Sequence, residues 1–210
     1  MWGMHRLMII VFLLLPVSAP VAADLQLAPE LRQFLREHPS IRVRMHSHWP
    51  PFIFADDGTP QGISIDYLRL AAAKLGVAID NAPPMSFAEV IRRLPTGDGV
   101  DVQPTMRATD HRRGHIHFSR PYTTFPVIIV TRSGSPFVGS LDDLAGRLVV
   151  AEQAYWYSEE IRRDHPAIRL KTVPTSDEAL RQLAQGDADA YVGVLPVATW
   201  HMEHKGYTNL

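Results

Sequence analysis

Cysteine is absent from the 210-residue chain. Without a thiol, disulfide bonds, thiol nucleophiles and thiolate metal sites are all excluded, and the folded state depends on core packing alone. An excess of charge of one sign is also absent, because 21 Lys and Arg residues oppose 22 Asp and Glu residues, for a formal net charge of −1. Nucleic-acid binding normally requires a strongly basic face, so this balance argues against nucleic acid as a partner.

No apolar run after residue 23 approaches the length of a membrane span, and the run before it is short. Residues 1–6 carry positive charge, residues 7–17 are apolar but contain Pro16, and small residues precede Asp24. This pattern predicts a secretory signal peptide, residues 1–23, cleaved after Ala23. An uncleaved N-terminal anchor is the alternative. The rest of the chain suffices for one ordinary domain or two small lobes.

Strand-like and helix-like hydrophobic periods alternate after a short helix expected at 29–37, which Pro39 ends. The next expected elements are a strand at 41–45, a helix at 66–76 closed by Gly76, a strand at 77–82, a helix at 86–94 with a capping box between Ser86 and Glu89, and a strand at 100–104. This order is a βαβαβ unit.

A second unit of the same kind follows. Its expected strands are 147–152, 168–173 and 189–194, and its expected helices are 158–165, 176–186 and 196–205. Residues 86–102 match residues 175–192 in helix cap, apolar spacing and Gly-Asp closure, although any helix-to-strand connection in an α/β protein could give this likeness. Two similar lobes are expected.

Two segments indicate where a ligand would bind. Residues 121–134 place two prolines around a short polar stretch before an apolar strand, which suits a crossing strand between lobes. Residues 49–67 begin with a bend, because Pro50 and Pro51 prevent the strand at 41–45 from continuing. Trp49 and Phe52 therefore lie at a strand end, where α/β folds place ligands, and a ligand is expected between the lobes.

The motifs VRMHSHWPPF, GISIDYLRLAAAKLG, SFAEVIRRL, VDVQPTMRATDHRRGHIHFSRPY, LDDLAGRLVVA and SDEALRQLAQGDADAYVG together cover about residues 40–200. In this order and spacing, the chain resembles the bacterial extracellular solute-binding proteins of the amino-acid-binding type, which have the two-lobed Venus-flytrap fold. Through PELRQFLREHPSIRV and WPPF it looks most like the periplasmic sensor domains of hybrid histidine kinases.

The resemblance implies an α/β fold, the two-lobed periplasmic binding protein (type II) fold, in a periplasmic protein. Residues 24–39 would form an N-terminal helix, 40–125 lobe 1, and 126–210 lobe 2 ending at the second hinge. The C-terminal part of lobe 1 would then be missing. We therefore expect a fragment of a longer reading frame that exposes apolar surface on lobe 1.

The resemblance also implies which residues bind the ligand. Trp49 and Phe87 fall where the family sandwiches its ligand between aromatic faces. Arg112 matches the arginine that grips the ligand's carboxylate, as a guanidinium fork can. Thr105 and Arg107 lie on the approach to that helix start, where an anion is favoured. The alternative is that the aromatics are core residues and the arginines solvated surface charges.

Three departures from the family pattern bear on the ligand. Val194 stands where amino-acid binders commonly carry an Asp, so the α-amino anchor is missing. His46 and His48 replace acidic positions near the aromatic bend. Tyr155 occupies the small-residue position at the start of the lobe-2 helix, so it should contact the ligand. A carboxylate, plain or aromatic, is thus favoured over a zwitterionic amino acid.

These features predict a solute-binding domain that captures a small carboxylate-bearing solute, as the ligand-sensing input of a signalling receptor. A free substrate-binding component of an ABC amino-acid or organic-acid importer is the alternative, so the partner is a transporter permease or a membrane-linked signalling module. A periplasmic dehydratase or a lytic-enzyme-associated domain is a remote alternative. No enzymatic activity is expected, because no nucleophile has an evident base; Glu152, Glu159 and Glu160 are interpreted as surface or helix-start residues.

Neither a metal nor a cofactor is expected. His111, His115 and His117, with His46 and His48, have spacings that do not bring three imidazoles to one helical face, and no acidic or thiol ligand completes the set. A histidine pH switch at the cleft mouth is a separate hypothesis.

Overall fold

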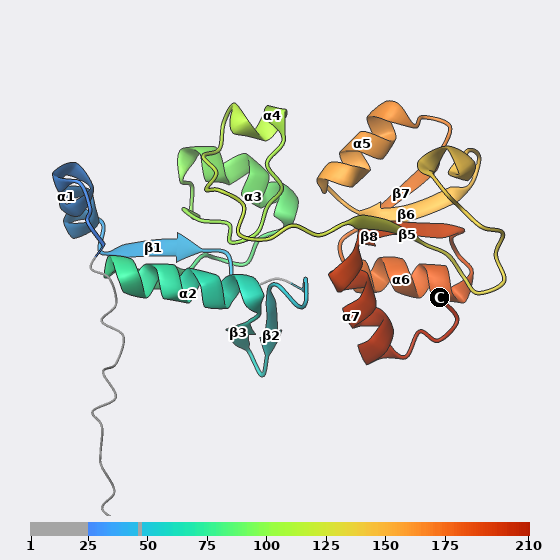
Figure 1. Cartoon of the computed structure of the whole chain (residues 1–210), viewed down its shortest axis with the longest axis horizontal. Helices are drawn as coiled ribbons and strands as arrows, with labels where there is room; N and C mark the ends of the chain where they lie inside the picture. Colours follow the sequence, from blue (N-terminus) through green and yellow to red (C-terminus); the bar gives the residue numbers. More distant parts are fainter. Residues whose placement is uncertain (1–24, 46–47) are drawn as a thin grey trace, which may run out of the picture.

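The computed structural model describes residues 25–45 and 48–210. They form two α/β lobes that lie side by side and are joined by an extended segment leading into strand β5 (Figure 1). The expected signal peptide at 1–23, its cleavage after Ala23, and His46 fall outside the described residues. Within the described part, no helix is long and apolar enough to cross a membrane.

The first lobe is built around a short parallel pair of strands, β1 and β4, which run in register from Ser40↔Ala78 to Val43↔Asn81. Its elements are α1 (Pro29–Glu37), β1 (Ser40–Val43), β2 (Phe54–Asp56), β3 (Thr59–Gln61), α2 (Ile63–Leu75), β4 (Ala78–Asn81), α3 (Phe87–Arg93), the 3₁₀ helix η1 (Leu94–Thr96) and α4 (Asp110–Arg113). Strands β2 and β3 form an antiparallel hairpin.

Most of the expected elements of this lobe are confirmed. Helix α1 covers the expected 29–37, and α2 ends with Gly76 in the left-handed conformation. Both bonds of the capping box at Ser86 are present at the start of α3. The prediction of a strand at 100–104 is wrong, because within this range Val102 alone pairs, in an isolated bridge to Val43. Pro104 follows closely and has no N–H with which to extend a ladder.

The second lobe contains a four-stranded sheet in the order β5-β8-β6-β7, and its expected strands and helices are confirmed. Strand β5 is antiparallel to β8, whereas β6 runs parallel to β7 and β8. Its elements are β5 (Val127–Val130), the 3₁₀ helix η2 (Leu141–Leu144), β6 (Leu148–Glu152), α5 (Trp156–Asp164), β7 (Arg169–Val173), α6 (Ser176–Gln185), β8 (Ala190–Val194) and α7 (Leu195–Lys205). Because β5 begins at Val127, we propose residues 125–126 as the boundary between the lobes.

Helices cover both faces of this sheet, with α5 on one side and α6 and α7 on the other (Figure 1). Alternate residues of β6 serve the two faces: Val149 and Ala151 pack towards Tyr157 and Ile161 of α5, and Val150 packs towards the helices α6 and α7. A strand buried on both faces explains why 148–152 is almost entirely apolar.

The two lobes touch one another. The buried cluster that contains Val43 and Ile65 of the first lobe continues to Tyr157 of the second. Away from this core, Phe54 of the β2–β3 hairpin lies 5.9 Å from the Trp200 ring of α7, measured between ring centroids. The lobes are therefore in a closed arrangement. The first lobe also exposes Ile63, Tyr67 and Leu70 along one side of α2, the apolar exposure expected there.

Candidate functional site

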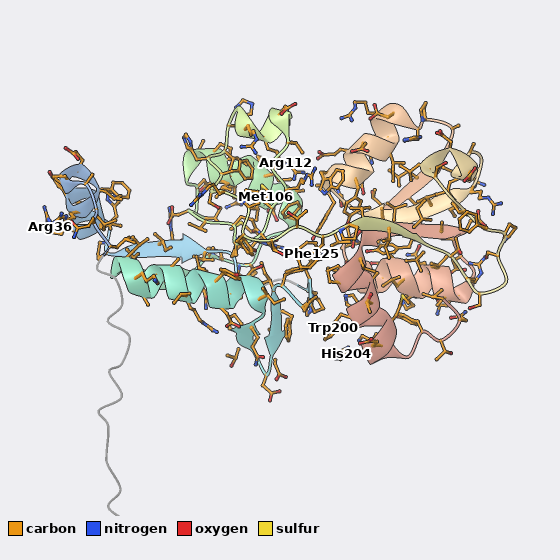
Figure 2. All side chains as sticks on the ribbon, in the orientation of Figure 1. Arg36, Met106, Arg112, Phe125, Trp200 and His204 are labelled. Carbon is orange, nitrogen blue, oxygen red and sulfur yellow. The ribbon has the colours of Figure 1, made fainter. Side chains whose placement is uncertain are left out.

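A cavity of about 60 Å³ lies between the lobes, and all six residues predicted to bind ligand line it. Those six are Trp49 on the bend after β1, Phe87 at the start of α3, Thr105 and Arg107 before α4, Arg112 in α4, and Tyr155 before α5. Figure 2 shows Arg112 and Met106, another lining residue, on the side of the first lobe that faces the second. The sequence therefore predicted which residues the fold brings together; their role in binding stays a prediction.

The bend that carries Trp49 is held by backbone hydrogen bonds. The Trp49 N–H donates to the Ile53 carbonyl at 2.8 Å, and the first N–H groups of α2 donate to the carbonyls of Pro51 and Phe52. Gly62 permits this close approach, since its φ is +118° and a Cβ atom there would lie 2.3 Å from the Phe52 carbonyl oxygen. The start of α2 thus fixes the aromatic wall of the cavity.

Tyr155 packs against both aromatic residues that were expected to sandwich a ligand. Its ring centroid lies 4.8 Å from that of Phe87 and 5.8 Å from that of Trp49, at interplanar angles of 38° and 51°. Both partners belong to the first lobe, whereas Tyr155 belongs to the second. A side chain of the second lobe therefore contacts both rings that were expected to hold a ligand.

Arg112 is buried and bonded across the cleft. Its side chain is 2% exposed, and Nη2 donates to the Ala154 carbonyl of the second lobe at 3.0 Å. The Glu159 carboxylate lies 3.5 Å from the same nitrogen, but that side chain is 44% exposed. Burial lowers the pKa of Arg112, and Glu159 only partly opposes the shift. In this closed arrangement, Arg112 fastens one lobe to the other.

Arg107 makes a second cationic contact between the lobes. Its side chain is exposed, and its guanidinium carbon lies 4.8 Å from the ring centroid of Trp156, at the start of α5. Thr105 is half-buried, and its carbonyl accepts a hydrogen bond from the Gln103 side chain at 2.9 Å. Both residues therefore lie on the cavity side of the segment before α4, as expected.

Arg44 is a site residue that the sequence analysis missed. Only 8% of it is exposed, and its Nε donates to the Met85 carbonyl at 3.0 Å. Among the described residues, neither of its terminal nitrogens has a hydrogen-bond or ion-pair partner, and burial lowers its pKa. The available signal was weak: an arginine that directly follows a strand ending at a proline bend.

A second cavity, of about 370 Å³, adjoins the first. Arg44, Trp49, Phe87 and Tyr155 line both cavities, so these side chains form the wall between them. On its far side the second cavity is lined by residues of the second lobe, including Gln153, Thr175 and Ser176, and by the exposed His48.

None of the described residues that line these two cavities is acidic, although the carboxylate of Glu152 is bonded to Tyr157 and Ser176 of their lining. Val194 lies at the end of β8, lines the first cavity and is buried, so the apolar departure noted in the sequence faces the site. Among residues 25–45 and 48–210, no group of three or more His, Asp or Glu side chains is arranged to hold a metal ion.

Glu152 corrects an expectation, because it is a core residue and not a surface one. It is 1% exposed and accepts hydrogen bonds from Tyr157 at 2.6 Å, from Tyr191 at 2.8 Å and from Ser176. Burial raises its pKa, while these three hydroxyl donors favour the ionised form. The cluster ties the end of β6 to α5, α6 and β8, directly behind Tyr155.

Two α/β lobes joined by an extended segment, with an arginine-rich and aromatic cavity between them, define a two-lobed solute-binding domain. The chain belongs to the bacterial extracellular solute-binding proteins, family 3, whose family model matches residues 41–193. The family is therefore one of extracellular or periplasmic binding domains.

Sensor proteins and amino-acid-binding proteins both occur among the relatives. The virulence sensor protein BvgS of Bordetella pertussis is 27% identical over 172 residues, which cover 81% of this chain and 14% of BvgS. The probable amino-acid-binding protein YxeM of Bacillus subtilis is 26% identical over 144 residues, covering 68% of this chain and 54% of YxeM. The chain thus spans about half of one relative and a small part of the other.

The fold agrees with these relatives. The crystal structure of a histidine kinase sensor domain with similarity to periplasmic binding proteins matches with a TM-score of 0.77 and 27% identity, covering 83% of this chain and 76% of that one. The two-lobed fold expected from the sequence is therefore confirmed.

Proposed function

We propose that this domain captures a small carboxylate-bearing solute between its lobes and serves as the periplasmic ligand-sensing input of a signalling receptor. The observation that carries the proposal is the charge of Arg112. A guanidinium that is 2% exposed has as its only anionic neighbour among the described residues a half-exposed carboxylate at 3.5 Å. A buried cation whose ion pair is long and solvent-exposed is incompletely compensated, and a ligand carboxylate would supply a closer partner through two charge-assisted hydrogen bonds.

The surroundings favour an anion over an ammonium group. Arg44 and Arg107 also line the cavity, whereas Val194 removes the acidic partner that an α-amino group would need. Aromatic walls suit an apolar or planar ligand body. A carboxylate with an aromatic or apolar remainder fits both properties.

In the closed arrangement, little space is left beside Arg112. The cavity that Arg112 lines holds about 60 Å³, far less than the roughly 300 Å³ at which small-molecule pockets begin, and a larger neighbouring cavity of about 710 Å³, lined by Trp49 and Arg107 among others, is not lined by Arg112. An incoming ligand therefore replaces the Tyr155 ring beside Trp49 and Phe87 and competes with Glu159 for Arg112. The contacts that the ligand replaces, those of Tyr155 with Trp49 and Phe87 and that of Arg112 with Glu159, all join the two lobes. Ligand binding therefore changes the balance between open and closed arrangements.

A sensing role is supported by the BvgS relative, which covers more of this chain than the YxeM relative does. A free substrate-binding component of an importer is the second candidate, and the YxeM relative supports it. The two roles share the ligand site and differ in the partner that responds to lobe closure.

Calorimetric titration of the purified chain with benzoate and with arginine tests the ligand class. We expect benzoate to bind and arginine to bind more weakly, since the cavity offers no anionic anchor to a second cation. Arg112→Gln should lower benzoate affinity by about 10- to 100-fold, the worth of charged hydrogen bonds. Arg113→Gln is the matched control, because Arg113 is exposed and packs over Phe118.

Two results would contradict the proposal. One is tight binding of arginine with no response to carboxylates. The other is an equal loss of benzoate affinity in the Arg112 and Arg113 variants, because that result would mean that only general positive charge matters.

A further inference from the structure

Arg44 is the second buried cation of the cleft, and the ligand described so far leaves it without a partner. Its backbone N–H donates to the Val102 carbonyl at 3.2 Å and its Nε to the Met85 carbonyl at 3.0 Å, so the side chain is held at both ends of its stem. The terminal nitrogens are unbonded within the described residues, and Arg44 lines both cavities. Four N–H donors of a guanidinium that is more than nine-tenths buried are thus available at one position.

The start of α6 lines the second cavity together with Arg44. Thr175 and Ser176 line that cavity, and Thr175 caps the helix by accepting the Glu178 N–H at 3.2 Å. The N–H groups of Ser176 and Asp177 have no acceptor in the described part of the chain. A ten-residue helix therefore presents free N–H groups and the positive end of its dipole near an unpaired guanidinium.

The acidic residues of the first turn of α6 have other partners. Asp177 accepts from the Tyr207 hydroxyl at 3.2 Å and lies 3.9 Å from the Lys205 ammonium. Glu178 accepts from the Gln182 side chain at 3.2 Å. Neither acidic side chain lines the second cavity, so its charged lining is Arg44, with His48 at the rim.

We propose that the cleft takes a ligand with two anionic groups, one held by Arg112 in the first cavity and the other between Arg44 and the start of α6 in the second. The planar middle of such a ligand replaces the Tyr155 ring, which at present forms the wall between the two cavities. The inference rests on the proposed function and names its ligand class, a dicarboxylate.

The charge balance of the site supports two anionic groups over one. Arg44 and Arg112 are both buried, and among the described residues Glu159, at 3.5 Å from Arg112, is the one carboxylate in an ion pair with either of them. The buried Glu152 accepts a hydrogen bond from Ser176 and does not line either cavity. A monocarboxylate at Arg112 leaves Arg44, which lines both cavities, without an anionic partner. A second carboxylate supplies that partner and gains the free N–H groups of α6.

Titration of the full chain with benzene-1,4-dicarboxylate and with benzoate tests the inference, since the two probes share a ring and differ by one carboxylate. The dicarboxylate should bind at least tenfold more tightly. Arg44→Gln should reduce dicarboxylate affinity to near the benzoate value, a larger loss than the same variant causes for benzoate, whereas Arg112→Gln should weaken both probes to a similar extent. Arg44→Lys, which keeps the charge, should retain part of the dicarboxylate preference.

Equal affinity of the unmodified chain for the two probes would overturn the inference, and this comparison needs no variant to fold. An Arg44→Gln variant that weakens both probes equally would overturn it too. Benzoate binding that depends on Arg112, without any gain from the second carboxylate, would leave the proposed function intact and reject the dicarboxylate alone. Failure of both probes to bind would reject both.

Discussion

Tyr155→Ala should increase the affinity of the domain for benzoate. In the closed structure the Tyr155 ring packs against Phe87 and Trp49, with centroid distances of 4.8 and 5.8 Å. A ligand that occupies the same space must first displace this ring, so the measured affinity is reduced by the fraction of molecules in which Tyr155 is seated. Removing the ring removes that competition.

The two ring contacts set the expected size of the effect. Each aromatic pair is worth about 0.5–1.5 kcal/mol, so together they favour the seated state by about 1–3 kcal/mol, or roughly 5- to 150-fold. Tyr155→Ala should therefore raise benzoate affinity by about 5- to 150-fold in calorimetric titration. Phe137→Ala is the control, because Phe137 is 94% exposed and lies outside both cavities.

A second measurement separates competition from simple damage. Without ligand, Tyr155→Ala should have a larger radius of gyration in small-angle X-ray scattering, since an aromatic contact between the lobes is lost, and benzoate should reverse the increase. A folded Tyr155→Ala protein that binds benzoate as well as, or less well than, the unmodified chain would refute the reasoning, because Tyr155 would then be a ligand contact or a bystander.

Three further substitutions test separate parts of the structure. Glu159→Gln should raise benzoate affinity about two- to fivefold, because the exposed carboxylate that competes for Arg112 is gone, and an unchanged titration would remove Glu159 from the mechanism. His201 is buried with both ring nitrogens unbonded among described residues, and burial, opposed by Asp177, lowers its pKa from 6.5 to about 4. Because the unfolded chain protonates first, stability should fall as pH drops from 6.5 towards 4, and His201→Leu should flatten that part of the denaturation profile. Gly62→Ala should destabilise the fold by about 2–4 kcal/mol in urea titrations, since its Cβ would overlap a backbone carbonyl; unchanged stability would exclude the strained turn.

The regular elements could be predicted because their signals are local. The capping box at Ser86 needs only Glu89 three residues later, and both of its hydrogen bonds form. Gly76 and Gly186 end their helices in the left-handed conformation, as the apolar periods before them indicate. The hydrophobic pattern gave a wrong prediction at 100–104. A strand is expected there, but only one bridge forms, before Pro104, which has no N–H to continue the pairing.

The candidate site was only partly predictable because its charges are placed by distant contacts. Glu152 is a charged residue at the end of an apolar strand, which predicts a surface position, yet its hydroxyl partners Ser176 and Tyr191 lie 24 and 39 residues away in the chain. Arg44 is buried because Val102 and Met85 fold over it from other segments. No pattern within residues 40–52 contains that information.

The hydrogen bond from Arg112 to the Ala154 carbonyl, which joins the lobes, does not require a particular side chain at position 154. Arg112 donates to a main-chain oxygen, so every amino acid at position 154 supplies the same acceptor. What matters is the direction of that oxygen, which the left-handed backbone at Ala154, with φ of +64°, determines. An alanine scan would therefore overlook this contact, because position 154 is already alanine. The contact would respond to backbone chemistry: glycine should relax it, and a β-branched residue should turn the oxygen away from its partner.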